Sequence, residues 1–123
     1  MPNKHCDMVT YDQVKAELIF ATRTQETVPY QRIARLMHLP PSGNYMGHEI
    51  GYILGEISED AFEVGHPMLS AIAVSNSGKP GDGFYALARE LNLLQNQTEE
   101  EFWEDEKCRV YDAWALPEQV ELY

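Results

Sequence analysis

The sequence has few basic residues: its 123 residues include 9 Lys and Arg against 20 Asp and Glu, which gives a formal net charge of −11 at pH 7. The imbalance is strongest in residues 94–123, which hold 2 basic and 9 acidic side chains. An acidic surface repels nucleic-acid phosphates and anionic lipids. We therefore expect neither non-specific nucleic-acid binding nor attachment to a membrane, and an acidic face suits a basic protein partner instead.

Cysteines and long apolar runs are also scarce. Cys6 and Cys108 are the only two cysteines and match no metal-binding or redox spacing. No apolar stretch approaches the roughly 20 residues needed to cross a bilayer, and the N-terminal residues lack the apolar core of a signal peptide. The composition, with 44% apolar and 11% aromatic residues, is that of a globular protein. We expect a single cytoplasmic domain over residues 1–123, of bacterial or phage type, with reduced thiols.

Catalytic and metal-binding motifs are missing as well. His48 precedes a glutamate as in a zinc-protease helix, but no second histidine stands four residues further on. The Gly81–Gly83 turn lacks the Lys-Ser/Thr pair of a phosphate-binding loop, so its Asp82 is expected to cap a helix. The sequence therefore predicts no catalytic residue, no metal site and no cofactor.

Five helices are expected from apolar positions that recur at helical spacing. They cover about residues 11–24, 30–38, 45–64, 84–94 and 99–115. Capping boxes open the first at Thr10 and the last at Thr98, Pro29 can open the second, and Gly65 ends the third. The third helix carries three glycines on one face, Gly47, Gly51 and Gly55. Their spacing indicates either the close approach of a neighbouring element or a local irregularity of the helix.

One segment is typical of a strand: the apolar run Met68–Val74, which ends at a Ser-Asn-Ser-Gly turn. We expect it to pair with the Val28 region and to return through a hairpin whose tip is Asn76–Lys79. The order of helix, short extended segment, two helices, strand and turn is that of a winged helix. The sequence thus predicts a mostly helical α+β fold with a winged-helix-like core over residues 10–91 and an acidic C-terminal helix over residues 98–115.

Three pieces of the chain follow one another in the order Val28-Pro29-Tyr30, Gly47–Gly55 and Pro67–Val74. In this order they resemble winged-helix modules, and among them the alkyltransferase-like DNA-binding proteins. The reactive Pro-Cys-His-Arg signature of the alkyltransferases is replaced by His66-Pro-Met-Leu-Ser, so alkyl transfer to a cysteine is not implied. Pro67–Ala71 together with the Pro80–Phe84 turn also resembles segments of small uncharacterised bacterial proteins, which implies no activity.

The resemblance implies that the third helix is used for recognition, but its charge is unusual for DNA. That helix offers Tyr45 and His48 and carries no Lys or Arg, while the second helix offers only Arg32 and Arg35. Because DNA binding requires several cations to contact phosphates, the sequence favours protein contacts instead.

The last helix is rich in aromatic side chains: Phe102, Trp103, Tyr111 and Trp114. Aromatic rings at this density either fill the core or anchor a partner or dimer surface, and both readings stay open. The residues expected to bind a partner are Tyr45, His48, Arg32, Arg35, Trp103 and Trp114.

We predict a non-enzymatic interaction or regulatory protein that uses an acidic winged-helix-like domain for protein contacts, with a homodimer as one form. It could also inhibit a nucleic-acid-binding enzyme by imitating the charge of DNA. Two alternatives stay open. The first is a sequence-specific DNA-binding regulator that reads bases through Ser42–His48 and the wing. The second is a small enzyme with a pocket between the third helix and the Pro80–Phe84 turn, using His48 or His66.

Overall fold

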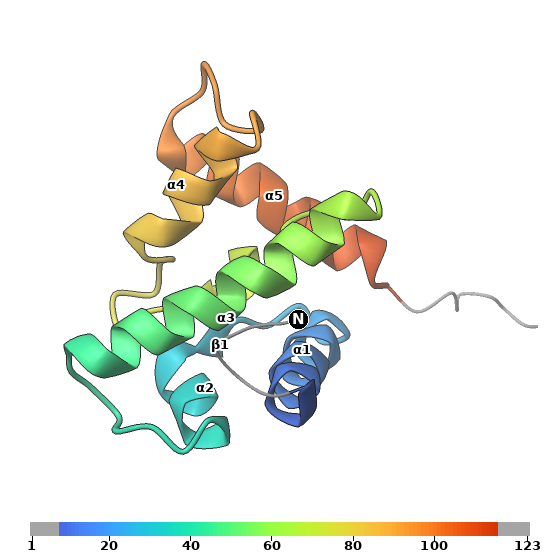
Figure 1. The fold of residues 1–123 in the computed structure, drawn as a ribbon. Coiled ribbons are helices and arrows are strands. Elements are labelled where there is room, and N and C mark those ends of the chain that lie inside the picture. Colours follow the sequence, from blue (N-terminus) through green and yellow to red (C-terminus); the bar gives the residue numbers. More distant parts are fainter. Residues whose placement is uncertain (1–7, 116–123) are drawn as a thin grey trace, which may run out of the picture.

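A computed structural model describes residues 8–115 of the chain. Within these residues, five α-helices surround two very short strands, and the longest helix crosses the middle of the molecule (Figure 1). The elements are α1 (Met8–Thr22), β1 (Val28–Pro29), α2 (Tyr30–Leu36), α3 (Asn44–Glu63), the 3-10 helix η1 (Leu69–Ile72), β2 (Ala73–Val74), α4 (Asp82–Glu90) and α5 (Glu99–Ala113). The fold is therefore α+β and mostly helical, as the sequence predicts.

The first helix, α1, turns a buried face with Val14, Leu18 and Ala21 toward the core. These residues recur at the helical spacing from which the helix was predicted. The helix is already formed at Met8, so Thr10 lies inside it. The predicted capping box at Thr10 is therefore wrong.

The second helix, α2, follows β1 directly. Pro29 is the residue at its N-terminal cap, with φ −67° and ψ 148°. The prediction that this proline opens the helix is therefore confirmed. The fixed φ of proline suits the position, and no backbone N–H is needed there. Ile33 and Ala34 are buried. The helix ends at Leu36, two residues before the predicted end, and His38 turns the chain with a φ of 59°.

The third helix, α3, buries the stripe predicted for it: Met46, Ile50, Ile53, Leu54, Ile57 and Ala61. Gly65 ends the helix with a φ of +84°. The Gly65 N–H donates to the carbonyl of Phe62 at 3.0 Å, and the His66 N–H donates to that of Ala61 at 2.8 Å. This pair of hydrogen bonds is a Schellman motif, which confirms Gly65 as the C-terminal cap.

The predicted strand Met68–Val74 is mostly wrong. Leu69–Ile72 forms the 3-10 helix η1, and only Ala73–Val74 is extended. All residues of this run are buried, and an apolar run buried on every side carries no periodicity that separates strand from helix. The short strand β2 does pair with β1, but the two are parallel, with Val28 opposite Ala73.

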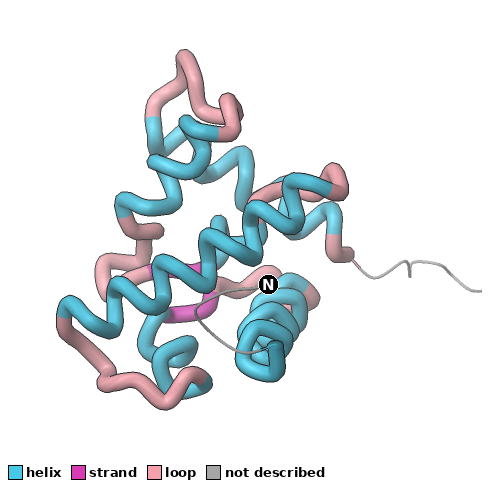
Figure 2. The backbone as a smooth tube through the Cα atoms, viewed as in Figure 1, coloured by secondary structure: helices cyan, strands magenta, loops and turns pink. Residues whose placement is uncertain are grey.

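The parallel pair lies near the centre of the molecule, beside α3 (Figure 2). Residues 8–115 contain no β-hairpin, because the two paired strands are the only strands described there and they run in the same direction. In place of a second hairpin strand, residues 75–79 form a turn in which the Ser75 N–H donates to the carbonyl of Lys79 at 2.8 Å. The chain then continues into α4.

The two last helices begin in different ways. At α5 the Thr98 hydroxyl accepts the Glu101 N–H, and the Glu101 carboxylate accepts the Thr98 N–H, each at 3.1 Å, which confirms the predicted capping box. At α4 the capping position is Gly81, and Asp82 is already the first helical residue and makes no capping hydrogen bond. The predicted role of Asp82 as the cap is therefore wrong.

The buried apolar residues form one continuous core that includes residues from every helix. Its centre is η1, which contacts α1, α3 and α5. Phe102, Trp103 and Val110 place one side of α5 in this core. The last helix therefore packs against its own chain.

Candidate functional site

Exposed aromatic and acidic side chains lie along one face of α3. Tyr45, His48 and Tyr52 recur every three or four residues in its N-terminal half, and Tyr45 is 63% exposed and Tyr52 48% exposed. The same face continues with Glu59 and Glu63 in the C-terminal half, both exposed. We call this face, residues 45, 48, 52, 56, 59 and 63, the α3 stripe.

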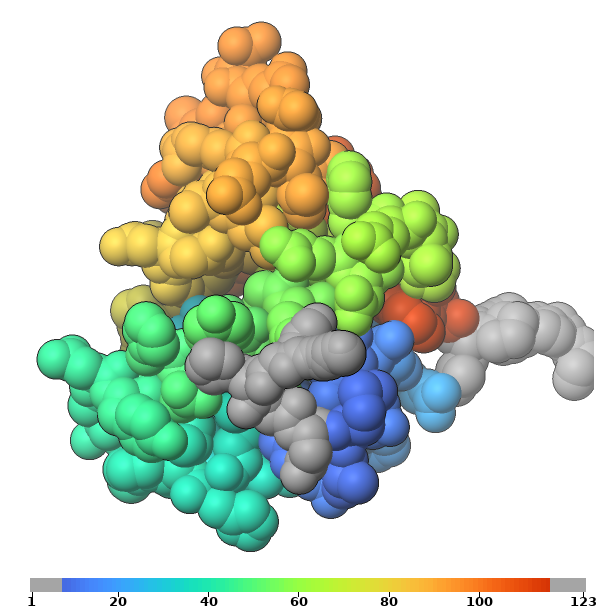
Figure 3. Space-filling view, in the orientation of Figure 1, coloured from blue at the N-terminus to red at the C-terminus, as the bar shows by residue number. Residues whose placement is uncertain are grey.

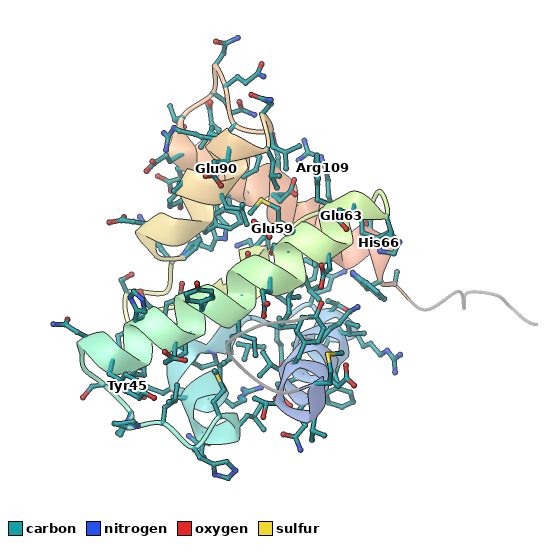
Figure 4. All side chains as sticks on the ribbon, in the orientation of Figure 1. Tyr45, Glu59, Glu63, His66, Glu90 and Arg109 are labelled. Carbon is teal, nitrogen blue, oxygen red and sulfur yellow. The ribbon has the colours of Figure 1, made fainter. Side chains whose placement is uncertain are left out.

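The α3 stripe has an aromatic end and an acidic end. Figure 4 shows Tyr45 at the start of the helix, Glu59 and Glu63 toward its other end, and His66 just beyond it. His48 packs near Tyr52, with ring centroids 6.1 Å apart. No Lys or Arg occurs in α3, so all of its charged side chains other than His48 are carboxylates.

Beside the α3 stripe, the glycine face of the helix is open. A Cβ placed on Gly47, Gly51 or Gly55 would meet no atom within 4 Å, so the predicted close approach of a neighbouring element is wrong. The three glycines instead line a cavity of about 170 Å³ whose opposite wall is the Gly81–Phe84 segment.

This cavity lies where the enzyme alternative places its pocket, between the third helix and the Pro80–Phe84 turn. Its polar lining includes Tyr30, whose hydroxyl accepts the Gly81 N–H at 2.8 Å, and the buried Ser70. Burial raises the pKa of Tyr30, so the phenol stays neutral and acts as a hydrogen-bonding group. Neither His48 nor His66 lines the cavity.

His66 borders a second cavity, of about 330 Å³, near the C-terminal end of α3. Its lining includes Phe62, His66, Leu93, Phe102, Glu106 and Arg109. The imidazole of His66 packs edge-on against Trp114, with ring centroids 5.1 Å apart. Both imidazoles are exposed, and their contacts within residues 8–115 are with aromatic rings, Trp114 for His66 and Tyr52 for His48.

Sequence reasoning missed Glu106, the buried acid of this second cavity. The carboxylate is 3% exposed, and its two oxygens accept the Met68 N–H at 2.8 Å and the Arg109 guanidinium at 2.6 Å. The sequence does contain a signal for its burial: Glu106 stands four residues after Phe102 and four before Val110, which places it on the buried side of α5. Both oxygens bind within the chain, so this carboxylate holds α5 against the loop that precedes η1.

The two basic residues predicted to contact a partner do not form an open cationic patch. Arg32 binds the Glu17 carboxylate on α1 at 2.8 Å. Arg35, three residues further along α2, is exposed. One of the two guanidinium groups is therefore already neutralised by its own chain.

The two tryptophans predicted as binding residues have different surroundings. Trp103 is 6% exposed, its Nε1 donates to the carbonyl of Ala71 at 2.8 Å, and the Lys107 ammonium lies 4.0 Å from its ring centroid. Trp114 is partly buried beside His66. Trp103 thus fills the core, which is the first of the two interpretations of the aromatic residues.

Within the described residues, no three His, Cys, Asp or Glu side chains come close enough together to hold a metal ion. None of the helices in this part of the chain has both the length and the apolar character needed to span a membrane. No family model, curated protein or solved structure matches the chain. The functional assignment therefore depends on the geometry of the site.

Proposed function

We propose that the protein is a non-enzymatic interaction module that contacts a protein partner through the α3 stripe. The observation that carries the proposal is the composition of this stripe: exposed Tyr45, His48 and Tyr52, followed by a row of carboxylates, on a helix without Lys or Arg. Tyrosines are frequent anchors of protein interfaces, because a large ring with a polar tip is buried at low entropic cost.

The proposal includes a winged-helix-like core. It is supported by the order α1, β1, α2, α3, β2 and by the pairing of β1 with the segment after α3. In winged-helix modules the third helix is the recognition helix. The α3 stripe takes that place here with carboxylates where a DNA-binding helix carries cations, which favours a protein partner over DNA.

The chemistry of the α3 stripe also indicates what kind of partner fits it. Its acidic half, with Glu59 and Glu63, suits Lys or Arg side chains, and its aromatic half, with Tyr45, suits an apolar or cationic side chain packed on the ring. The partner we propose is therefore a basic segment of another protein.

Photo-crosslinking in the native cells tests this proposal. Benzoylphenylalanine is placed at position 45, on the α3 stripe, and in a second variant at Gln31, an exposed residue of α2. We expect one defined protein adduct from position 45 and none from position 31. The combined substitutions Glu59→Lys and Glu63→Lys should abolish that adduct, because they reverse the charge without changing the core.

Three results would contradict the proposal. They are an equal adduct from position 31, an adduct that survives the charge reversal, and crosslinking of position 45 to nucleic acid. A gel-shift series at low salt completes the test, because salt-sensitive DNA binding that is lost in Arg35→Ala would favour the DNA-binding alternative.

A further inference from the structure

The first helix, α1, is apolar on two opposite sides. One side, with Val14 and Leu18, is buried in the core. The other carries Val9, Ala16 and Phe20, which lie on one helix face because they are spaced by seven and four residues. Val9 is 65% exposed and Phe20 is 67% exposed. In the space-filling view, α1 (blue) lies at an edge of the molecule (Figure 3).

The part of the chain around α1 is also its least acidic part. Residues 8–43 carry four Lys or Arg and three Asp or Glu, whereas residues 44–115 carry four and fourteen. Two copies of a protein with a net charge of −11 repel each other. Two copies that meet through α1 bring together the parts of their surfaces where this repulsion is weakest. The charge distribution therefore favours a second copy of the chain as the partner that covers the exposed face of α1.

The two ends of the exposed face carry opposite charges. Asp12 lies in the first half of α1, and Arg23 is the residue directly after its last one, Thr22; both are exposed. The Arg23 N–H still donates to the Phe20 carbonyl at 3.1 Å, so the two side chains lie about three helical turns, or roughly 16 Å, apart on the same side. If two α1 helices pack antiparallel, Asp12 of each copy faces Arg23 of the other. A parallel pair would place like charges opposite each other.

We propose that the protein self-associates through α1, with two copies packed antiparallel around a twofold axis. Ala16 stands between the charged ends, where its small side chain lets the two helices approach closely, and Phe20 covers the adjoining surface of the other copy. This surface is separate from the α3 stripe, so the proposal stands or falls independently of the proposed function.

The strength of this dimer is limited by its size. One pair of 15-residue helices buries less than the roughly 800 Å² per partner that is usual for stable complexes. We therefore expect a dissociation constant in the micromolar to millimolar range. Sedimentation equilibrium in 150 mM salt, from about 5 µM to about 1 mM, measures it directly. A protein that remains monomeric over this whole range overturns the proposal.

Two matched serine substitutions locate the interface. Phe20→Ser should raise the dissociation constant at least about tenfold, because each dimer loses two buried rings. Val64→Ser, at a residue that is 69% exposed beyond the end of α3, should leave it unchanged. Both side chains are exposed, and circular dichroism checks that both variants fold. Equal effects of the two substitutions would place the contact elsewhere and overturn the proposal.

Charge exchange tests the antiparallel arrangement. Asp12→Arg and Arg23→Asp should each raise the dissociation constant about threefold or more, because each replaces two attractive contacts with repulsive ones. The double variant restores opposite charges at both ends and should return to within about twofold of the original protein. A double variant that associates no better than the single ones overturns the proposed pairing.

Discussion

The buried serine pair between α3 and η1 gives a sharp test of the packing. The Ser58 hydroxyl donates to the Ser70 hydroxyl at 2.7 Å and accepts the Ser70 N–H at 3.0 Å. Ser58 is 0% exposed and Ser70 is 4% exposed. Ser58→Ala therefore removes the partner that a buried backbone N–H has among residues 8–115, whereas Ser70→Ala leaves that hydrogen bond in place.

The two substitutions remove the same atom type from the same place, so their difference isolates the backbone hydrogen bond. A buried donor without a partner costs about 1–3 kcal/mol, and Ser58→Ala also removes the hydroxyl–hydroxyl contact. We expect it to lower the free energy of unfolding by about 2–3 kcal/mol, and Ser70→Ala by about 1 kcal/mol.

Urea denaturation followed by tryptophan fluorescence measures both values. With a slope of about 1.5 kcal/mol per molar urea, the midpoint should fall by roughly 1.3–2 M for Ser58→Ala and by about 0.7 M for Ser70→Ala. Equal costs, or a larger cost for Ser70→Ala, would refute the hydrogen-bonding scheme. An unchanged slope in both variants serves as the control that the unfolding reaction is the same.

Three further predictions concern a pair of glycines, the buried acid and the tyrosines. Gly51→Ala should stabilise the protein by about 0.5–1 kcal/mol, because the added methyl meets open space and alanine favours a helix. Gly65→Ala should lower the free energy of unfolding by about 1 kcal/mol, because alanine is strained at a φ of +84°. Thermal unfolding of the two variants measures both changes. Glu106→Ala should lower the free energy of unfolding by about 2–4 kcal/mol, because it removes a buried carboxylate and the acceptor of the Met68 N–H. Urea denaturation of the variant measures this loss, and a loss below about 0.5 kcal/mol would contradict the prediction. Burial raises the pKa of four tyrosines: Tyr11, Tyr30, Tyr85 and Tyr111. A raised pKa in the folded state means that stability is fully present below about pH 10 and is lost as pH rises further, since the unfolded chain ionises first; absorbance at 295 nm should therefore rise at higher pH in the native protein than in urea.

The sequence was sufficient to predict where the five helices lie, because apolar residues recur at helical spacing in each of them. It was sufficient too for Gly65 and Thr98, whose roles as caps depend on local chemistry alone. Local chemistry failed to predict the role of Asp82, because Gly81 takes the capping position and the helix begins at Asp82 itself, two residues before the predicted start. It also failed at Met68–Val74, where burial on all sides removes the alternation that marks a strand.

The candidate site was predictable only in part. Tyr45 and His48 were singled out from their place at the start of the third helix, and both are exposed there. Trp103 was assigned as a binding residue, yet it lies in the core, because an aromatic-rich helix does not itself indicate which rings face inward. The exposed face with Phe20 was overlooked, since the apolar residues on both sides of α1 obscure the single stripe that a surface helix normally shows.

The least regular element of the fold has a consequence for motion. Leu69–Ile72 is a single 3-10 turn, yet three helices pack on it, Trp103 donates to its Ala71 carbonyl, and its Ser70 N–H is held by Ser58. An opening that exposes these amides to solvent must separate all three helices at once, which amounts to global unfolding. The slowest hydrogen exchange in the molecule should therefore occur in this four-residue turn and not in the 20-residue α3 that spans it.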